Sequence, residues 1–292
     1  MTTKIQWHDR FNIGVESVDK AHQRLFSIVN KMVNYDEEDE KGRQWVCAEG
    51  IKYFKNYTLR HFADEEAYMQ SINYSGYVVH KRVHDDLKEK TLPALEKDMV
   101  ESDYSVESVQ HFLGICIGWL TGHIMLEDHA ITGRISNKWK YERTEELSVL
   151  EEAVSKVIKE LLGLEAQVIS EHYAGEDFGK RMCYRLAYRN EENKKTHVFF
   201  VMEEKLLLHI INQLLGKQLT KVSKVVVDAG SLIAQQFLKR VGSYYNSLEV
   251  NKLEKVNILS TDQLSQDFGI EYPQYSMLFN TGVGYFALSV KN

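Results

Sequence analysis

Apolar residues in the first 130 or so positions recur at steps of three and four, the spacing that places side chains on one face of an α-helix. Within residues 18–33, Leu25, Phe26 and Val29 share such a face with His22. The same spacing continues through residues 44–72, a segment from Tyr77 past Pro93, and residues 105–130. Four amphipathic helices with short connections predict an all-α four-helix bundle.

The pattern changes after a polar stretch at 133–146, and the second half of the chain mixes strand-like and helix-like segments. Apolar alternation predicts strands at 166–172, 181–189 and 196–202 and a hairpin over 275–290. Helical spacing returns at 146–162, 203–215 and 225–245. This order predicts an α+β domain with a mostly antiparallel sheet. We therefore expect two domains, residues 1–138 and 147–292, joined by a linker at 139–146.

Composition then narrows the functional classes. The 292 residues include 42 acidic and 36 basic residues, which argues against a nucleic-acid-binding protein with a basic face. No apolar run reaches the ~18–20 residues of a membrane span, and the first residues lack the apolar segment of a signal peptide. The cysteines, Cys47, Cys116 and Cys183, show no paired spacing, so we expect free thiols in a cytoplasmic protein.

Histidine is concentrated in the predicted bundle, which contains eight of the 11 histidines. Residues four apart lie on one helix face, so His61 with Glu65 and His80 with His84 each direct two side chains toward one point. A further histidine lies on the apolar face of the first helix and another on that of the fourth. A carboxylate follows the latter by five residues, where it can reach further round the helix end. The predicted metal ligands are His22, His61, Glu65, His80, His84, His123 and Asp128.

Each of these residues has an ordinary structural alternative. A single histidine on an apolar face is usually a core residue, and one pair four apart is more often structural than metal-binding. Seven such groups on the inward faces of four helices would instead leave buried polar atoms that a metal satisfies. His8, His111 and His129 lack this phasing, and we expect surface or structural roles for them. We expect solvated charges at Asp64, Glu66, Asp85 and Asp86.

The number and type of the predicted ligands indicate the metal. Seven ligands exceed what one ion comfortably takes, and five imidazoles with two bridging carboxylates describe a dinuclear site. Imidazole and carboxylate without thiolate favour iron over manganese or zinc. The set contains more imidazole than the ferritin-like di-iron pattern of several Glu and Glu-x-x-His pairs. This difference favours reversible O2 binding over oxidase chemistry.

Three sequence stretches and one histidine pair carry a family resemblance. They are VDKAHQRLF at 18–26, HFADEEAYM at 61–69, the pair His80 and His84, and HIMLED at 123–128. In order and spacing they resemble the hemerythrin signature, and WHDRFNIGVESVD at 7–19 resembles the N-terminal arm of bacterial hemerythrins. The resemblance covers about residues 1–135 and implies two iron ions joined by an oxo or hydroxo bridge.

The same resemblance implies a role for each ligand. His80, His84 and His123 would hold one iron, and His22 and His61 would hold the other. Glu65 and Asp128 would bridge the two. The iron with fewer histidines would bind O2 in an apolar pocket lined by Leu25, Phe62, Trp119 and Leu126.

The second half carries a separate resemblance, in residues 163–168, 203–216, 228–234 and 278–290. These stretches are similar to the CheX family of chemotaxis phosphatases and their CheC-like relatives. The catalytic helix of that family carries Glu-x-x-Asn, whereas this chain has Asp228 and Ser231 at the aligned positions. Serine lacks the amide that would direct a water molecule, so we expect a degenerate pair and no catalytic residue. The expected partners are a phosphorylated CheY-like receiver domain and a second copy of the chain.

These observations favour an O2 sensor, or a redox or NO sensor, in which a di-iron bundle is coupled to a CheX-like signalling domain. Fusion to a second domain favours sensing, because a simple carrier needs no output domain. Two other classes stay open. One is an O2 or iron carrier or store whose second domain mediates oligomerisation. The other is an enzyme, either a di-iron oxidase or peroxidase or an active aspartyl-phosphate phosphatase.

Overall fold

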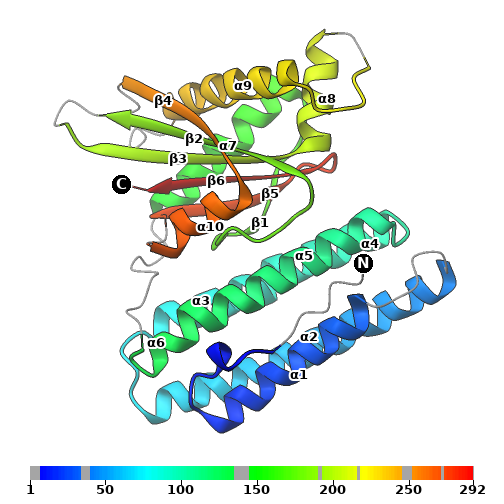
Figure 1. Cartoon of the computed structure of the whole chain (residues 1–292), viewed down its shortest axis with the longest axis vertical. Helices are drawn as coiled ribbons and strands as arrows, with labels where there is room; N and C mark the ends of the chain where they lie inside the picture. The colour runs from blue at the N-terminus through cyan, green and yellow to red at the C-terminus, as the bar shows by residue number, and fades with distance from the viewer. Residues whose placement is uncertain are drawn as a thin grey trace. The chain divides into compact units, whose positions relative to one another are not determined.

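The computed structural model describes residues 7–33, 40–134, 145–189, 193–215, 218–244, 252–270 and 273–291. The chain divides into two compact units, residues 1–140 with 176–178 and residues 141–175 with 179–292 (Figure 1). Most of the predicted linker, residues 139–144, lies outside the described residues. No helix in the described ranges is both long and apolar enough to cross a membrane.

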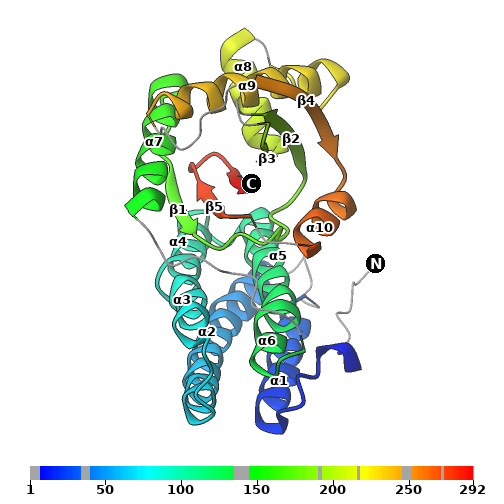
Figure 2. The same cartoon turned by 90° about the vertical axis from the view of Figure 1, so that its left-hand side faces the viewer.

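The first unit contains the predicted four-helix bundle (Figure 2). Its first two helices are α1 (Glu16–Val33) and α2 (Glu40–Ser71). The third helix consists of α3 (Tyr77–Asp86), η2 (Leu87–Thr91) and α4 (Leu92–Glu101). The fourth consists of α5 (Val106–His123), η3 (Ile124–Asp128) and α6 (His129–Ile131). Helix α1 packs against α2 and α5, α2 against α3, and α4 against α5, which closes the bundle.

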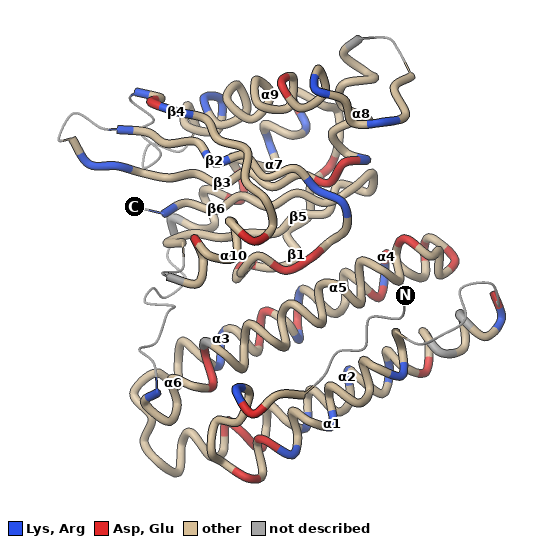
Figure 3. Tube along the Cα trace, in the orientation of Figure 1, with Lys and Arg blue, Asp and Glu red and all other residues tan. Residues whose placement is uncertain are grey.

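The sequence explains where these helices begin and which faces they bury. Ser105 caps α5 by accepting a hydrogen bond from the backbone N–H of Ser108 at 3.2 Å. The apolar stripes point inward, as shown by the buried side chains of Leu25, Phe54 and Phe112. Acidic and basic residues both occur along α1 and α2 (Figure 3), and surface ion pairs join some of them to neighbouring charges.

Each of the last two bundle helices contains one wide, π-helical turn. In η2 the N–H of Leu92 donates to the carbonyl of Leu87, five residues earlier, and in η3 His129 donates likewise to Ile124. Pro93 lies two residues after the end of η2, and in a regular α-helix its ring would collide with the carbonyl four residues before it, within η2. Proline therefore accounts for η2. The turn η3 contains no proline and needs another cause.

An arm precedes α1 and is tied to the bundle at several points. It contains the short helix η1 (Asp9–Phe11). The carboxylate of Asp19 accepts hydrogen bonds from the backbone N–H of Ile13 at 2.7 Å and of Gly14 at 3.1 Å. Gly14 has φ of +92°, a conformation that favours glycine. The guanidinium of Arg134, just after α6, donates to a carbonyl of the arm.

The second unit is α+β with a six-stranded sheet in the order β1-β5-β6-β3-β2-β4, and every neighbouring pair is antiparallel. The strands are β1 (Gln167–Ser170), β2 (Arg181–Arg189), β3 (Lys195–Glu203), β4 (Lys252–Leu259), β5 (Tyr275–Asn280) and β6 (Tyr285–Lys291). The helices are α7 (Glu145–Leu162), α8 (Glu204–Leu215), α9 (Lys224–Gly242) and α10 (Thr261–Ile270). The predicted fold class is confirmed, although the sequence pattern did not predict α10.

Helices α7, α8 and α9 share one core with the sheet. Alternate residues of β2 face this core, and the hydroxyl of Tyr184 donates to the carbonyl of Val227 on α9 at 3.1 Å. A Cβ at Gly230 would collide with the Tyr184 ring, so glycine at this position lets α9 approach the sheet closely. The close fit places the outward face of α9, which includes Asp228, at the surface of the unit.

Candidate metal centre

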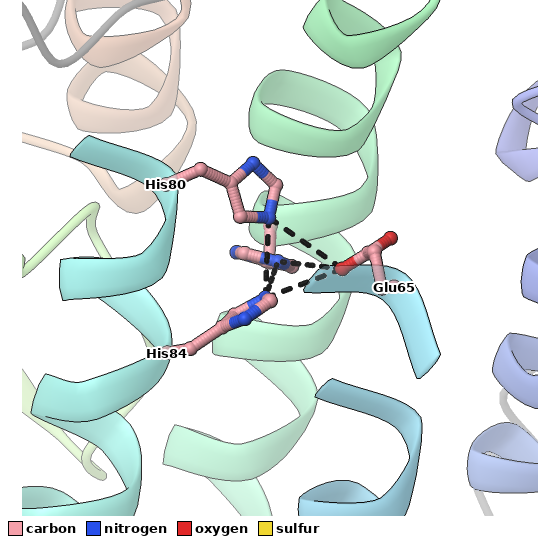
Figure 4. A group of neighbouring side chains, drawn as sticks. Glu65, His80 and His84 are labelled. Atoms are coloured by element: carbon pink, nitrogen blue, oxygen red, sulfur yellow. Dashed lines mark hydrogen bonds and ion pairs between the residues drawn. The ribbon is translucent and has the colours of Figure 1, made fainter. Parts of the chain in front are cut away.

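Three imidazoles and one carboxylate converge inside the bundle. His80 and His84 come from α3, His123 from the end of α5, and Glu65 from α2. The Nε2 atom of His84 lies 3.1 Å from that of His80 and 3.0 Å from that of His123. It also lies 3.2 Å from Oε2 of Glu65, and Figure 4 shows Glu65 directed toward His80 and His84. We call these four buried residues the three-histidine group.

A second group lies beside the first. The Nε2 atoms of His22 on α1 and His61 on α2 are 3.0 Å apart. Asp128 contacts both groups, since its Oδ2 lies 3.1 Å from His22 Nε2 and its Oδ1 lies 2.9 Å from His123 Nε2. Oε2 of Glu65 lies 4.0 Å from Nε2 of both His61 and His123. The structure thus brings all seven predicted ligands together, with the two carboxylates between the groups.

The spacing of the ring nitrogens fits metal ions. Two nitrogen ligands about 2.1 Å from one metal and at right angles to each other are about 3.0 Å apart. The Nε2 separations of 3.0 and 3.1 Å match that value in both groups. The carboxylate oxygens of Glu65 and Asp128 are buried, and none of their contacts within the described ranges has hydrogen-bond geometry. Cations held by these groups would satisfy the buried atoms.

The wide turn η3 explains how Asp128 reaches the centre. Residues five apart on a regular α-helix point in directions about 140° apart, because each residue turns the helix by about 100°. A turn closed by hydrogen bonds between residues five apart is wider and brings such residues much closer to the same side of the helix. Since η3 spans Ile124–Asp128, it turns Asp128 toward the side of the helix that carries His123. The widened backbone, together with the place of Asp128 near the end of the helix, thus brings the carboxylate to the centre.

Burial and neighbouring charges shift the pKa values of the ligand side chains in opposite directions. Burial lowers the pKa of His61 to about 3, although Glu65 attracts its proton, and burial also lowers the pKa of His84. For His123 the effect of burial is outweighed by Asp128 and Glu65, which raise its pKa to about 10. The neighbouring histidines hold the pKa of Glu65 and that of Asp128 below their usual range, against the effect of burial. Two ionised carboxylates therefore supply negative charge for a cation.

Side chains behind the ligands orient two of the imidazoles. Oε1 of Glu66 lies 3.1 Å from Nδ1 of His84, and the side chain of Glu66 is only 20% exposed. The ring of Phe62 stacks on that of His84 with centroids 3.7 Å apart and planes 5° apart. Trp119 stacks on His123 at 4.3 Å and 11°. The expectation that Glu66 is a solvated charge is wrong, because α2 places it against His84.

The other acids near the ligands divide into two kinds. Asp64 is exposed, as expected. Asp85 is partly exposed and pairs with Lys81 at 2.5 Å and with Lys88 at 2.8 Å. Asp86 is buried, so the expectation of a solvated charge is wrong at this position as well.

The remaining bundle histidines lie outside the two groups. His8 is exposed. His111 and His129 are buried, and burial lowers the pKa of His129. A structural role is the expectation that suits both buried rings.

Three of the four predicted O2-pocket residues, Leu25, Phe62 and Trp119, are buried in the bundle. The side chain of the fourth, Leu126, lies outside the described part of the structure. Trp7 of the N-terminal arm also approaches the centre, with its ring 6.5 Å from that of His22. Sequence reasoning did not single out this tryptophan, although the arm that contains it is part of the family resemblance. A role in O2 binding stays a prediction for the four expected pocket residues.

The predicted phosphatase pair lies on the outward side of α9. Asp228 is exposed, whereas Ser231 is half-buried. The side-chain amide of Gln235 donates to the carbonyl of Ser231 at 3.2 Å and approaches its hydroxyl at 3.4 Å. Val225 and Leu232 on the same helix are 68% and 61% exposed. The helix thus presents an exposed acid between exposed apolar side chains.

Two solved structures resemble the C-terminal half of the chain. The chemotaxis protein CheX from Vibrio vulnificus matches with a TM-score of 0.37 and 12% identity, over 51% of this chain and 99% of that structure. A CheC-like superfamily protein from Shewanella sp. PV-4 matches with a TM-score of 0.35 and 12% identity, over 52% and 100%. Likeness at this level carries no information about activity.

Relatives of the N-terminal half have higher sequence identity to this chain than those two structures. Residues 13–135 match the model of the hemerythrin HHE cation-binding domain. Bacteriohemerythrin from Clostridium acetobutylicum is 30% identical over 126 residues, which cover 42% of this chain and 94% of the relative. Bacteriohemerythrin from Pseudomonas aeruginosa is 28% identical over 123 residues, 42% and 75% of the two chains. Together with the convergent histidines and carboxylates, these matches show that the chain belongs to the hemerythrin family through its N-terminal unit.

Proposed function

We propose that the bundle binds two iron ions and O2, and that the second unit converts the state of this centre into a signal. One observation carries the proposal of a metal pair. Two histidine groups lie side by side with the carboxylates of Glu65 and Asp128 in contact with both. A carboxylate in that position can bridge two cations, which a single-metal site does not require.

The residues divide unequally between the two ions. His80, His84 and His123 would hold one iron, while His22 and His61 would hold the other. When bound, two ferrous ions supply the electrons for reversible uptake of O2. The group with fewer histidines leaves room for an exchangeable ligand, so O2 would enter on the side of His22 and His61. NO is the alternative ligand for this position.

Apolar side chains would protect the centre from water. Phe62 and Trp119 stack on ligand histidines, and Leu25 is buried in the same bundle; these side chains offer few hydrogen-bonding groups. An apolar wall of this kind slows the entry of water and protons, which would otherwise promote irreversible oxidation. This environment favours ligand binding over the oxidase or peroxidase alternative.

The second unit would act by binding a partner. Its sequence stretches resemble CheX proteins, and the outward face of α9 presents Asp228 beside Val225 and Leu232. This face could dock a phosphorylated receiver domain, while Ser231 lacks the amide that would aim a water molecule at the phosphoryl group. Binding without hydrolysis, under control of the centre in the bundle, is the function that we propose. The alternative is a carrier or store that uses this unit to oligomerise.

Metal analysis combined with optical spectra tests the first part. The full chain is loaded with ferrous iron without O2, and spectra are recorded reduced, in air, and after flushing with argon. We expect two irons per chain, with bands that appear in air and disappear under argon. A paired His22→Leu and His61→Leu variant should keep one metal and lose the bands. A wild-type chain that holds one zinc, or no metal, would overturn the proposal.

Receiver binding tests the second part. Association of the full chain with a phosphorylated CheY-type receiver is measured with the bundle reduced and with O2 present. We expect the affinity to differ between the two conditions, and the paired histidine variant should show no difference. Equal affinities in wild type would contradict coupling, whereas self-association alone would favour the carrier or storage alternative.

A further inference from the structure

His84 occupies a central place in the three-histidine group. Its Nε2 atom lies within 3.2 Å of the ligand atoms of His80, His123 and Glu65. Each of the other two imidazoles is therefore positioned relative to this ring. A small rotation of His84 would change several of these separations at once.

One stretch of α2 holds the His84 ring from behind. Phe62 and Glu66 lie four residues apart on α2, so they share a helix face. Phe62 stacks on the ring at 3.7 Å and blocks its tilt, while Oε1 of Glu66 lies 3.1 Å from Nδ1 and blocks its rotation. The neighbouring residue Glu65 faces the metal side of the same imidazole. This stretch of α2 thus contacts the flat face of the His84 ring, its Nδ1 atom and its Nε2 atom.

The contact with Glu66 also fixes the position of the ring proton. An ionised carboxylate only accepts hydrogen bonds, so a neutral His84 donates its single N–H from Nδ1 and keeps a lone pair on Nε2. A carboxylate behind an imidazole also makes the opposite nitrogen a stronger electron donor to a metal.

The other histidines contrast with His84. Within the described residues, the Nδ1 atoms of His22, His80 and His123 are buried and form no hydrogen bond. His84 is therefore a ligand in the centre whose rear nitrogen contacts an acid directly, at 3.1 Å. The contact with Glu66 thus belongs to the three-histidine group.

We propose that Glu66 is a positioning residue that fixes His84 and strengthens it as a donor, so that the two metals of the centre differ in affinity and in reduction potential. The inference rests on the proposed di-iron function. Removal of such a carboxylate typically lowers metal affinity about 10–100-fold. The weakening applies to the metal held by the three-histidine group.

The test compares Glu66→Ala, Glu66→Gln and a control, Asp64→Ala, which removes an exposed acid from the same helix. Full-length chains are loaded with ferrous iron, and two quantities are measured: release of each iron to an excess of chelator, and the midpoint potential of the centre. We expect Glu66→Ala to weaken one of the two irons about 10–100-fold and to leave the other unchanged. Glu66→Gln should retain iron better than Glu66→Ala, because its amide oxygen still accepts from Nδ1. It should nevertheless raise the potential, because the charge is gone.

Several outcomes separate this inference from its alternatives. Two irons in wild type, with equal release and equal potential in Glu66→Ala, would overturn the inference and leave the proposed function intact. Fewer than two irons in wild type would overturn the proposed function. A lower melting temperature of metal-free Glu66→Ala, with both irons lost in parallel, would make Glu66 a structural residue and would also overturn the inference. Asp64→Ala should match wild type in every measurement.

Discussion

Removal of the metal should destabilise the bundle and leave the second unit unchanged. Seven ionisable side chains are buried around the centre, and several of their polar atoms form no hydrogen bond within the described residues. Without a cation these atoms stay desolvated in the folded bundle, whereas water solvates them after unfolding. The perturbation is a strong iron chelator added to the reduced protein.

The size of the effect follows from mass action. A metal present at about 100 times its dissociation constant stabilises the folded state by about 2.7 kcal/mol. The bundle with its arm, residues 7–134, spans about 130 residues, and unfolding entropy is roughly 2.1 cal/mol/K per residue, which gives about 0.27 kcal/mol/K. Each metal should therefore raise the melting temperature by about 10 °C, and two metals by about 20 °C.

Scanning calorimetry of the full chain measures this shift, because two compact units are expected to give two transitions. Chelation should lower one transition by about 20 °C and leave the other in place. The paired variant His22→Leu and His61→Leu keeps the three-histidine group, so its shift should be about half as large. The reasoning is refuted if neither transition moves, or if both move equally.

Three further predictions concern single positions. Asp128→Asn replaces one of two oxygens that contact different histidines, so dialysis should find one tightly bound metal instead of two, and two retained ions would argue against bridging. Thr58→Val removes a buried hydroxyl that forms no hydrogen bond in the described ranges, so chemical denaturation should show a gain of about 1 kcal/mol; a loss would contradict this. Asp228→Glu with Ser231→Asn should speed phosphate release from a CheY-type regulator about 10²-fold, and no gain would contradict the alignment.

The fold could be predicted where one periodicity runs through a whole element. Helix α2 and strand β2 follow the expected patterns closely. Helix α10 was missed because its apolar residues are few, yet its start carries a local signal. Ser260 and Gln263 form a capping box, in which the Ser260 N–H donates to Oε1 of Gln263 at 2.9 Å and the Gln263 N–H donates to Oγ of Ser260 at 3.2 Å. Such a box predicts a helix start without any periodicity.

Some features of the site could likewise be predicted from sequence spacing, whereas others depend on how the helices pack. His61 with Glu65 follows from the fixed geometry of an α-helix, so sequence spacing is sufficient to predict that pair. The role of Glu66 depends on which helix packs beside α2, and a single sequence does not contain that information. The placement of Asp128 depends on a widened turn, and no proline marks the turn in the sequence.

The widened turn η3 also links the position of Asp128 to the direction of the helix that follows it. Each residue added to or removed from a helical turn rotates everything after it by about 100° and moves it by about 1.5 Å along the axis. If η3 closed to a regular α-helix, Asp128 would turn away from the side of His123, and α6 would rotate with it. The position of Asp128 and the angular setting of α6 therefore cannot change independently, because both depend on the width of η3.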